Sequence, residues 1–407
     1  MVLLVGGVVA QLIPLAASPL LAHLYTPEDF GVLALFMSFV SILSVVATGR
    51  YELAILNPPE DRDGLALLVL ACTIATVACG AVWIAVAGSC LVAPGSSLCS
   101  GPGMAREFTW LVPLAALSAA GLSALTTWAN RNKDYRRIAA VRVVQSGITA
   151  VASIGLGFAA LGAAGLIGAV VAAQWLAIAL LGSFVLSRSL PVFRTVSWAR
   201  IGHQARQQIA FPMINLPHAL LDNVQTVAVI GALSLAFGIG TTGLFAFMQR
   251  IMRAPLLLLG ASMGQVFQQQ VSAAHHEREP LRPLVLAQLR SLARWAVLFV
   301  LIAPFAPWLF ATIFGESWRE AGVYGLILTP WMVANFLVSP LSQLPLLLGR
   351  QRGALLYGLA YQAALLAPCV LALLGYTDAR GTFALQSAGA CLILAVYGRW
   401  LVRISDR

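Results

Sequence analysis

Pro14-Leu-Ala-Ala-Ser-Pro19 and Pro212-Met-Ile-Asn-Leu-Pro217 share one proline spacing inside two long apolar segments, which open the two halves of the chain. A proline inside a membrane helix frees backbone carbonyl groups and bends the helix. It is therefore tolerated mainly where a cavity or a neighbouring helix satisfies those groups. Matching broken helices in two membrane halves are typical of a transporter's substrate site. The pair thus predicts a membrane transporter built from two related halves.

The composition is that of a polytopic membrane protein. The 407 residues are 60% hydrophobic and 10% charged, whereas a soluble domain carries about 25% charged residues. Because each crossing needs about 20 apolar residues, the sequence predicts an all-α protein with about twelve transmembrane helices. The predicted spans are 2–22, 31–49, 64–90, 108–129, 138–160, 163–187, 208–235, 241–271, 295–314, 321–348, 353–376 and 382–402.

A basic polar segment divides the chain after the sixth predicted span. We expect an N-terminal six-helix lobe over 1–190, a cytoplasmic linker over 191–208 and a C-terminal six-helix lobe over 209–407. Because six is even, both lobes would enter the membrane from the same side. This favours a parallel, pseudo-symmetric repeat of two bundles.

The net charge of +10 follows membrane topology rather than nucleic acid binding. With a cytoplasmic N-terminus, most of the 25 basic residues fall at cytoplasmic helix ends or loops, as the positive-inside rule requires. An even number of spans then places both termini in the cytoplasm. The exceptions are three arginines on the outer side, and three within or at the edge of spans: Arg106, Arg319 and Arg380, and Arg50, Arg250 and Arg253.

A polar stripe is predicted in the seventh span. Asn215, His218, Asp222 and Gln225 follow at intervals that place them on one helix face. Polar side chains at bilayer depth are expensive and usually face a water-filled cavity or a partner. We therefore expect this face to line a cavity.

Arg250 and Arg253 share a face of the eighth span, at a depth similar to that of Asp222. One interpretation is a cationic cavity wall, with Gln249 beside it and Asp222 balancing part of the charge. The alternative is a closed ion pair that only locks the two helices together. Two arginines against one aspartate leave a surplus positive charge. This favours an anionic substrate, because a guanidinium donates two hydrogen bonds to phosphate oxygens.

Three further residues are candidates for the same cavity. Arg50 closes the second span beside Glu52, where it either anchors the helix through a local salt bridge or contacts a phosphate. Gln11 faces the same way as Ser18 in the first span and would line the cavity there. Asn335 in the tenth span either lines the cavity or hydrogen-bonds a neighbouring helix.

No motif points to an enzyme, a metal or a cofactor. The sequence shows no Ser/His/Asp arrangement, no paired catalytic carboxylates and no HExxH motif. The six cysteines lack metal spacing. Cys90 and Cys99 flank an outer loop, where an oxidising periplasm would allow a disulfide.

Two segments resemble a known family. Ala10-Gln-Leu-Ile-Pro-Leu-Ala-Ala-Ser-Pro-Leu-Leu-Ala-His-Leu-Tyr-Thr-Pro-Glu-Asp-Phe-Gly31 and Thr48-Gly-Arg-Tyr-Glu-Leu-Ala-Ile55 are similar to the opening of bacterial polysaccharide-biosynthesis membrane proteins. These are the lipid-linked oligosaccharide (Wzx-like, O-antigen) flippases of the MOP exporter superfamily. Because such proteins usually begin with a short cytoplasmic leader, we expect one ahead of Met1.

The resemblance implies a MATE-like, V-shaped pair of bundles around a central cavity that opens alternately to each side of the bacterial inner membrane. It implies that oligosaccharide repeat units on undecaprenyl diphosphate move from the cytoplasmic to the periplasmic leaflet, for O-antigen or exopolysaccharide synthesis. By position, Arg50, Arg250 and Arg253 match the family's basic cavity. Membrane lipids and a coupling proton or sodium ion are the other expected partners.

Two alternatives stay open. A MATE-type multidrug or cation exporter would prefer acidic cavity residues, whereas the intramembrane balance here is basic. A membrane polysaccharide polymerase or ligase would present a sizeable outer loop with catalytic arginines or histidines. The longest outer loop, over 92–107, holds one arginine.

Overall fold

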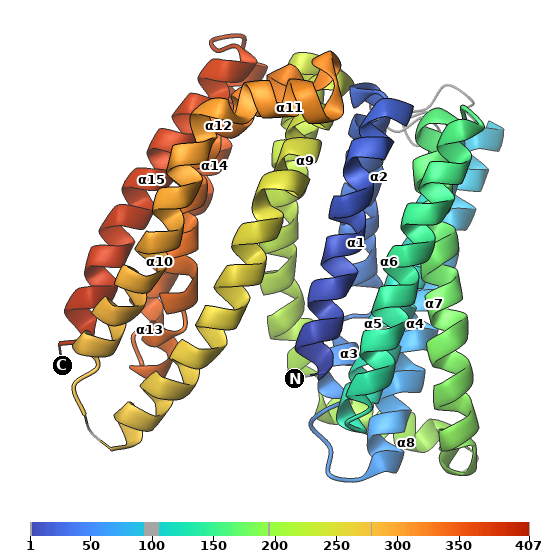
Figure 1. Cartoon of the computed structure of the whole chain (residues 1–407). Helices are drawn as coiled ribbons and strands as arrows, with labels where there is room; N and C mark the ends of the chain where they lie inside the picture. Colours follow the sequence, from blue (N-terminus) through green and yellow to red (C-terminus); the bar gives the residue numbers. More distant parts are fainter. Residues whose placement is uncertain (1, 93–105, 194–195, 278, 407) are drawn as a thin grey trace. The chain divides into compact units, whose positions relative to one another are not determined.

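A computed structural model shows an all-α protein and describes residues 2–92, 106–193, 196–277 and 279–406 (Figure 1). The chain forms two compact units, Met1–Ile230 and Gly231–Arg407. Within the described residues, 11 helices are long and apolar enough to cross a membrane. The predicted class, an all-α polytopic membrane protein, is therefore confirmed.

The first unit contains eight α-helices, a π-helical turn and the start of a ninth helix. They are α1 (Val2–Leu24), α2 (Pro27–Ala47), α3 (Tyr51–Ala54), α4 (Asp61–Val92), α5 (Arg106–Arg131), α6 (Tyr135–Phe158), α7 (Gly162–Phe193), α8 (Trp198–Gln207), η1 (Phe211–Asn215) and α9 (Leu216–His276). Apolar side chains of α2, α5 and α7, among them Phe36, Ala116 and Ile167, form a buried core.

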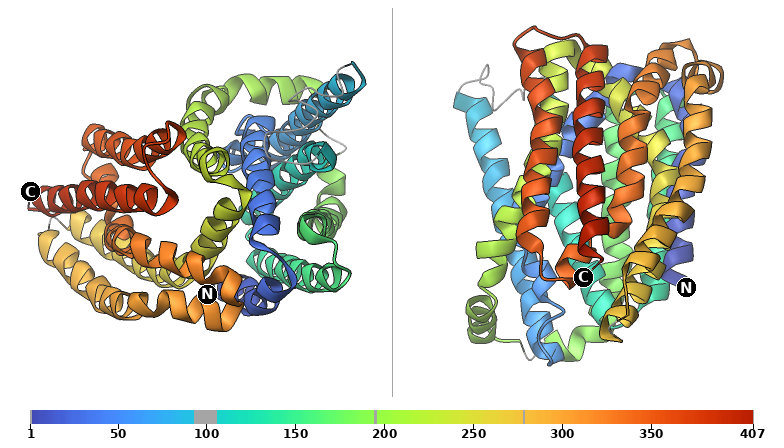
Figure 2. Two further views of the ribbon diagram at one scale, coloured as in Figure 1. Left: turned by 90° about the horizontal axis from the view of Figure 1, so that it is seen from above. Right: turned by 90° about the vertical axis from the view of Figure 1, so that its left-hand side faces the viewer.

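The second unit contains the rest of α9 and the C-terminal helices. They are α10 (Arg282–Ile302), η2 (Ala303–Phe305), α11 (Ala306–Phe314), η3 (Glu316–Trp318), α12 (Arg319–Val338), η4 (Ser339–Leu341), α13 (Leu344–Leu347), α14 (Gln351–Leu373) and α15 (Ala379–Ile404). Helix α15 packs against both α12 and α14, and Figure 2 shows α14 and α15 side by side.

The two predicted spans 208–235 and 241–271 fall largely in α9, on either side of a break. Non-helical torsion angles at Gly238 (φ 86°, ψ 170°) divide the 61 residues of α9 into two helical arms, which the 11 candidate spans count as one. A positive φ of this kind suits glycine, which lacks a Cβ. Hydropathy therefore located both arms, and the break at Gly238 lies between the two predicted spans.

The two proline pairs behave differently. Helix α1 stays helical through Pro14 and Pro19, so the expectation of a broken first span is wrong. The Ser18 hydroxyl donates to the carbonyl oxygen of Pro14 at 2.6 Å and is fully buried. The second pair coincides with an interruption, because Pro212 lies in the π-helical turn η1 and Pro217 opens α9.

Helices α1 and α6 approach closely at a pair of small residues. A Cβ added at Gly6 would overlap the Cβ of Ala139, whereas one added at Gly7 would meet nothing within 4 Å. Two adjacent glycines thus differ sharply in the space around them.

We expect Gly6→Ala to destabilise the first unit by about 1–3 kcal/mol, since an overpacked contact forces the helices apart. Gly7→Ala should be neutral or stabilising by up to about 1 kcal/mol, since alanine is the better helix former. Thermal unfolding of the detergent-purified variants measures both changes. Equal midpoints for the two variants would contradict the close contact between α1 and α6.

Candidate substrate-binding site

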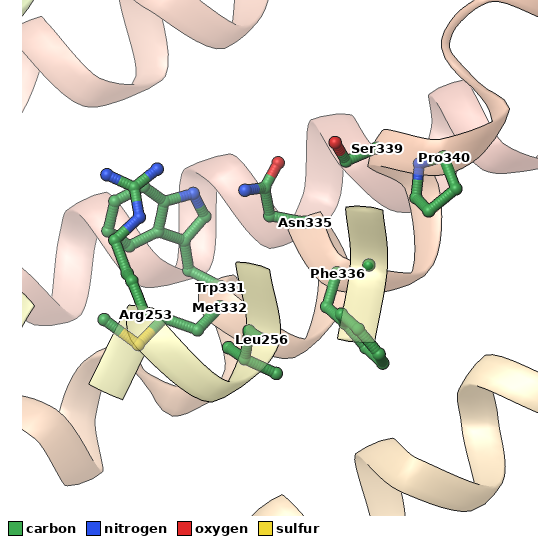
Figure 3. A pocket seen from close by; sticks show the side chains of 9 residues that line it. Arg253, Leu256, Trp331, Met332, Asn335, Phe336, Ser339 and Pro340 are labelled. Atoms are coloured by element: carbon green, nitrogen blue, oxygen red, sulfur yellow. The ribbon is translucent and has the colours of Figure 1, made fainter. Parts of the chain in front are cut away.

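The second unit holds a pocket of about 230 Å³ between α9 and α12. Its lining combines one cation, one amide and one hydroxyl with an apolar and aromatic wall: Arg253, Leu256, Gly260, Trp331, Met332, Asn335, Phe336, Ser339 and Pro340 (Figure 3). Two residues predicted to share a cavity, Arg253 and Asn335, thus lie in the same pocket.

Helix periodicity places these side chains. Trp331, Asn335 and Ser339 recur every four residues, so they project from one face of α12 and its continuation η4. On α9, Gly260 permits a close approach of the helices, because a Cβ there would already touch the Phe336 ring at 3.7 Å.

The pocket has a polar and an apolar side. In Figure 3 the polar ends of Arg253, Asn335 and Ser339 point to one side, and Leu256 and Phe336 lie on the other. Trp331 is held in place, because its indole N–H donates to the Tyr361 hydroxyl oxygen on α14 at 2.8 Å. A guanidinium suits phosphate oxygens, and an amide and a hydroxyl suit sugar hydroxyl groups.

Gln249 and Arg250 precede Arg253 on α9 and are half-buried. In the described part of the chain, the Gln249 side-chain oxygen is buried without a hydrogen-bond partner. Buried polar atoms are nearly always paired in native proteins, so this oxygen is an acceptor whose partner is not among the described residues. Gln249 and Arg253 are four residues apart and therefore share a helix face.

The predicted polar stripe is only partly described. The side chains of His218 and Asp222 lie outside the described residues, so the charge balance between Asp222 and the arginines stays a prediction. Asn215 is exposed in η1, Gln225 is half-buried, and Gln11 is exposed on α1. Ser18 is buried and does not line a cavity with Gln11. The side chain of Cys90 and the whole of Cys99, the predicted disulfide, also lie outside the described part of the chain.

Asn223 was missed by the sequence analysis. Its side-chain oxygen accepts from the Ser41 hydroxyl of α2 at 2.5 Å, and its side-chain nitrogen donates to the Ala219 carbonyl at 2.8 Å. An asparagine next to Asp222 in an apolar span was the available signal, since an intramembrane amide needs partners. Asn223 therefore ties the first turns of α9 to α2.

Arg50 lies in a rigid turn of the first unit. Its φ is 62°, in the left-handed region. Its guanidinium lies 3.4 Å from the carboxylate of Glu52, whose side chain is only 4% exposed. Within the described residues, the Arg50 Nε and Glu52 Oε2 atoms are buried without hydrogen-bond partners. Because Glu52 compensates its charge, Arg50 is a weaker candidate for an anion contact than Arg253.

Two contacts fix the segment around Arg50. The guanidinium of Arg131 donates to the carbonyl oxygens of Ile55, Pro58 and Pro59. The Tyr51 hydroxyl donates to the carbonyl oxygen of Ala205 at 3.0 Å, and burial raises the pKa of Tyr51, which keeps this donor protonated. The turn is therefore held from both sides within its unit.

The fold is that of the MOP-superfamily transporters. An inward-facing multidrug resistance MATE family transporter of that superfamily matches with a TM-score of 0.63 at 15% identity, covering 97% of this chain and 95% of its own. The inward closed lipid II flippase MurJ matches with a TM-score of 0.70 at 12% identity, covering 98% and 87%. A point mutant of the MATE transporter VcmN of Vibrio cholerae gives 0.61 at 14% identity, covering 99% and 94%.

The chain belongs to the polysaccharide biosynthesis protein family, whose model matches residues 20–323. The resemblance found in the sequence is thereby confirmed at the level of the family. No curated protein sequence matches the chain.

Proposed function

We propose that this protein is a flippase for lipid-linked oligosaccharides. It moves oligosaccharide repeat units on undecaprenyl diphosphate from the cytoplasmic to the periplasmic leaflet of the inner membrane, by alternating access. The observation that carries the proposal is the position of Arg253 in a membrane-spanning segment, in one pocket with Asn335 and Trp331. The polysaccharide biosynthesis family and the fold shared with the lipid II flippase MurJ support it.

The chemistry of such a substrate fits the pocket. A diphosphate cannot cross hydrocarbon unaided, because transferring a charge into a low-dielectric medium costs far more than thermal energy. A guanidinium in the pocket replaces part of the lost hydration with charge-assisted hydrogen bonds. Asn335 and Ser339 offer hydrogen bonds to sugar hydroxyl groups, and the isoprenoid tail stays in the lipid.

A multidrug or cation exporter is the second candidate, because the multidrug resistance MATE transporter shares the fold. A pocket that binds a cationic substrate would be expected to have acidic lining residues. None of the described residues that line the pocket is acidic, and Arg253 is cationic. The pocket therefore favours an anionic substrate.

Several features of the proposed machine extend the same inference. Lobes over 1–190 and 209–407 would rock around the substrate, with the segment 191–208 and both termini in the cytoplasm. Asp222 and His218 are the candidate proton carriers, and a sodium ion is the other candidate coupling ion. Arg50, Arg250, Gln249, Gln11 and Asn215 are the further proposed contacts of the sugar diphosphate.

A reconstituted assay tests the function. The protein is placed in liposomes with a fluorescent undecaprenyl diphosphate oligosaccharide, and a membrane-impermeant quencher reports the label that reaches the outer leaflet. We expect the wild-type protein to accelerate this exchange well above protein-free liposomes. Imposed proton and sodium gradients, applied separately, identify the coupling ion. Exchange no faster than in empty liposomes, together with gradient-driven uptake of a cationic dye, would replace the flippase with the exporter.

A further inference from the structure

The first unit contains a second, larger pocket with a cation in its wall. It has a volume of about 450 Å³ and lies between α5, α6 and α7. Six of its lining residues are polar: Ser123, Thr126, Thr127, Arg142, Gln145 and Gln174. None of the described residues that line it carries a carboxylate.

Arg142 is exposed, as is Arg136, whereas three other arginines near the α5–α6 turn have a described partner. Arg131 pairs with Asp61, Arg188 pairs with Asp134, and Arg137 stacks over the Phe184 ring at 3.0 Å from its centroid. Arg142 has no ion-pair partner among the residues that the structure describes. It also lies seven residues past Tyr135, the first residue of α6, or about 10 Å along the helix.

The deeper wall of the pocket presents a fixed amide. Gln174 lies in the middle of α7, and its side-chain amide lies 2.8 Å from the Ser118 hydroxyl oxygen, which also lies 2.7 Å from the Ala115 carbonyl oxygen. Ser118 engages one atom of the amide, so at least one amide N–H is left to donate toward the pocket that Gln174 lines. The Thr127 hydroxyl is likewise fixed, because it donates to the Ser123 carbonyl at 3.0 Å.

An uncompensated arginine at this depth, with amide donors beside it, is a site for an anion. Ionisable residues inside membrane segments mark binding or transport pathways, because an isolated charge there is expensive. Basic pockets between transmembrane helices bind lipid phosphate groups. The guanidinium and the amides offer donors, and no carboxylate among the described lining residues would repel the anion.

We propose that the pocket between α5, α6 and α7 binds a phosphate-bearing anion through Arg142, Gln145 and Gln174. The proposal does not depend on the substrate proposed above, because all three residues lie outside the pocket of Arg253. The phosphate has two sources, the headgroup of an anionic lipid or a soluble diphosphate group. Both present the same oxygens to the guanidinium.

Two binding experiments separate these sources. In the first, native mass spectrometry counts the phosphatidylglycerol molecules that stay on the protein after release from mixed phosphatidylcholine and phosphatidylglycerol nanodiscs. In the second, inorganic pyrophosphate is titrated into the protein in phosphatidylcholine nanodiscs, followed by calorimetry. We expect Arg142→Gln to weaken binding about 10–100-fold in whichever experiment detects it, the cost of losing a charged hydrogen-bond donor.

Three further variants make the test specific. Arg136→Gln removes the same charge from an exposed position of α6 that does not line the pocket, and should leave binding unchanged. Arg142→Lys should retain part of the affinity, because lysine keeps the positive charge. It should lose the rest, because lysine lacks the planar guanidinium group that donates two hydrogen bonds. Gln174→Ala removes no charge but should still weaken binding. If the Arg142 side chain were only hydrated and bound no anion in the pocket, Gln174→Ala would have no effect.

The outcomes decide the proposal in both directions. The proposal is supported if phosphatidylglycerol retention, or the heat released on adding pyrophosphate, depends on Arg142 and Gln174. The experiment that detects binding then identifies the source of the phosphate. Equal losses in Arg142→Gln and Arg136→Gln would show a general surface-charge effect and overturn it, as would no binding in either experiment. Thermal unfolding of each variant checks that the bundle is intact.

Discussion

Replacing Arg253 by alanine is expected to reduce flipping of a lipid diphosphate oligosaccharide at least about tenfold. A hydrogen bond to a charged group contributes about 1.5–3 kcal/mol, and about 1.4 kcal/mol is a factor of ten in an equilibrium constant. Arg253 lines the pocket together with the indole of Trp331, which Tyr361 holds from α14. Initial rates in the liposome assay measure the loss.

Graded variants identify what Arg253 contributes. Arg253→Lys should lie between wild type and alanine, because lysine keeps the charge without the bidentate geometry. Asn335→Ala should have a smaller effect, since it removes neutral hydrogen bonds of about 0.5–1.5 kcal/mol. The matched control is Arg352→Ala, an exposed arginine near the start of α14. Normal flipping by Arg253→Ala at normal protein levels would exclude this pocket as the diphosphate site.

Gly322→Ala is expected to destabilise the second unit strongly. A Cβ at Gly322 would lie 2.5 Å from the carbonyl oxygen of Ala306 and 2.6 Å from the Cα of Pro307. Both are backbone atoms of α11 and cannot rotate away. Overpacking of this kind costs about 1–3 kcal/mol or more, because the helices must separate.

The aromatic cluster next to this contact raises the expected cost. Phe247 of α9 lies 4.2 Å from Trp318 and 5.0 Å from Phe314, measured between ring centroids, and Trp318 is fully buried. Displacing α12 from α11 would loosen these contacts as well. The unfolding midpoint of the detergent-purified protein, followed by tryptophan fluorescence, should fall by several degrees.

Gly358→Ala provides the matched control. Gly358 lies in α14, and a Cβ there would meet nothing within 4 Å. Alanine should raise helix stability by up to about 1 kcal/mol. If Gly322→Ala unfolds at the wild-type temperature, the close packing of α11 on α12 is wrong.

Hydropathy and charge predicted the class of fold and the presence of Arg253 and Asn335 in one pocket. Apolar runs measure the free energy of transfer into lipid, so they locate helices whatever their neighbours are. For this reason the spans were found, including the two arms of α9 on either side of Gly238. The grouping of Arg253 with Asn335 followed from a similar argument, because polar side chains at bilayer depth need a common cavity.

The missed residues depend on tertiary contacts. The role of Asn223 rests on Ser41, which is far away in sequence. Arg142 was counted with the cytoplasmic arginines, although it lies within the predicted span 138–160, and α6 begins at Tyr135, which places Arg142 seven residues into the helix. Pro14 and Pro19 predicted a break that α1 does not have. Lipid offers no hydrogen-bond partners to backbone N–H and C=O groups, so the segment remains helical.

The hydrogen bond from Trp331 to Tyr361 fixes an indole ring in the wall of the Arg253 pocket. Indole emission responds to nearby charge and to water, so the pocket carries a built-in optical reporter. Binding of the proposed diphosphate beside Arg253 would change the electric field at that ring without any added label. The difference spectrum between the wild-type protein and Trp331→Phe therefore isolates occupancy of this pocket from the signal of the other tryptophans.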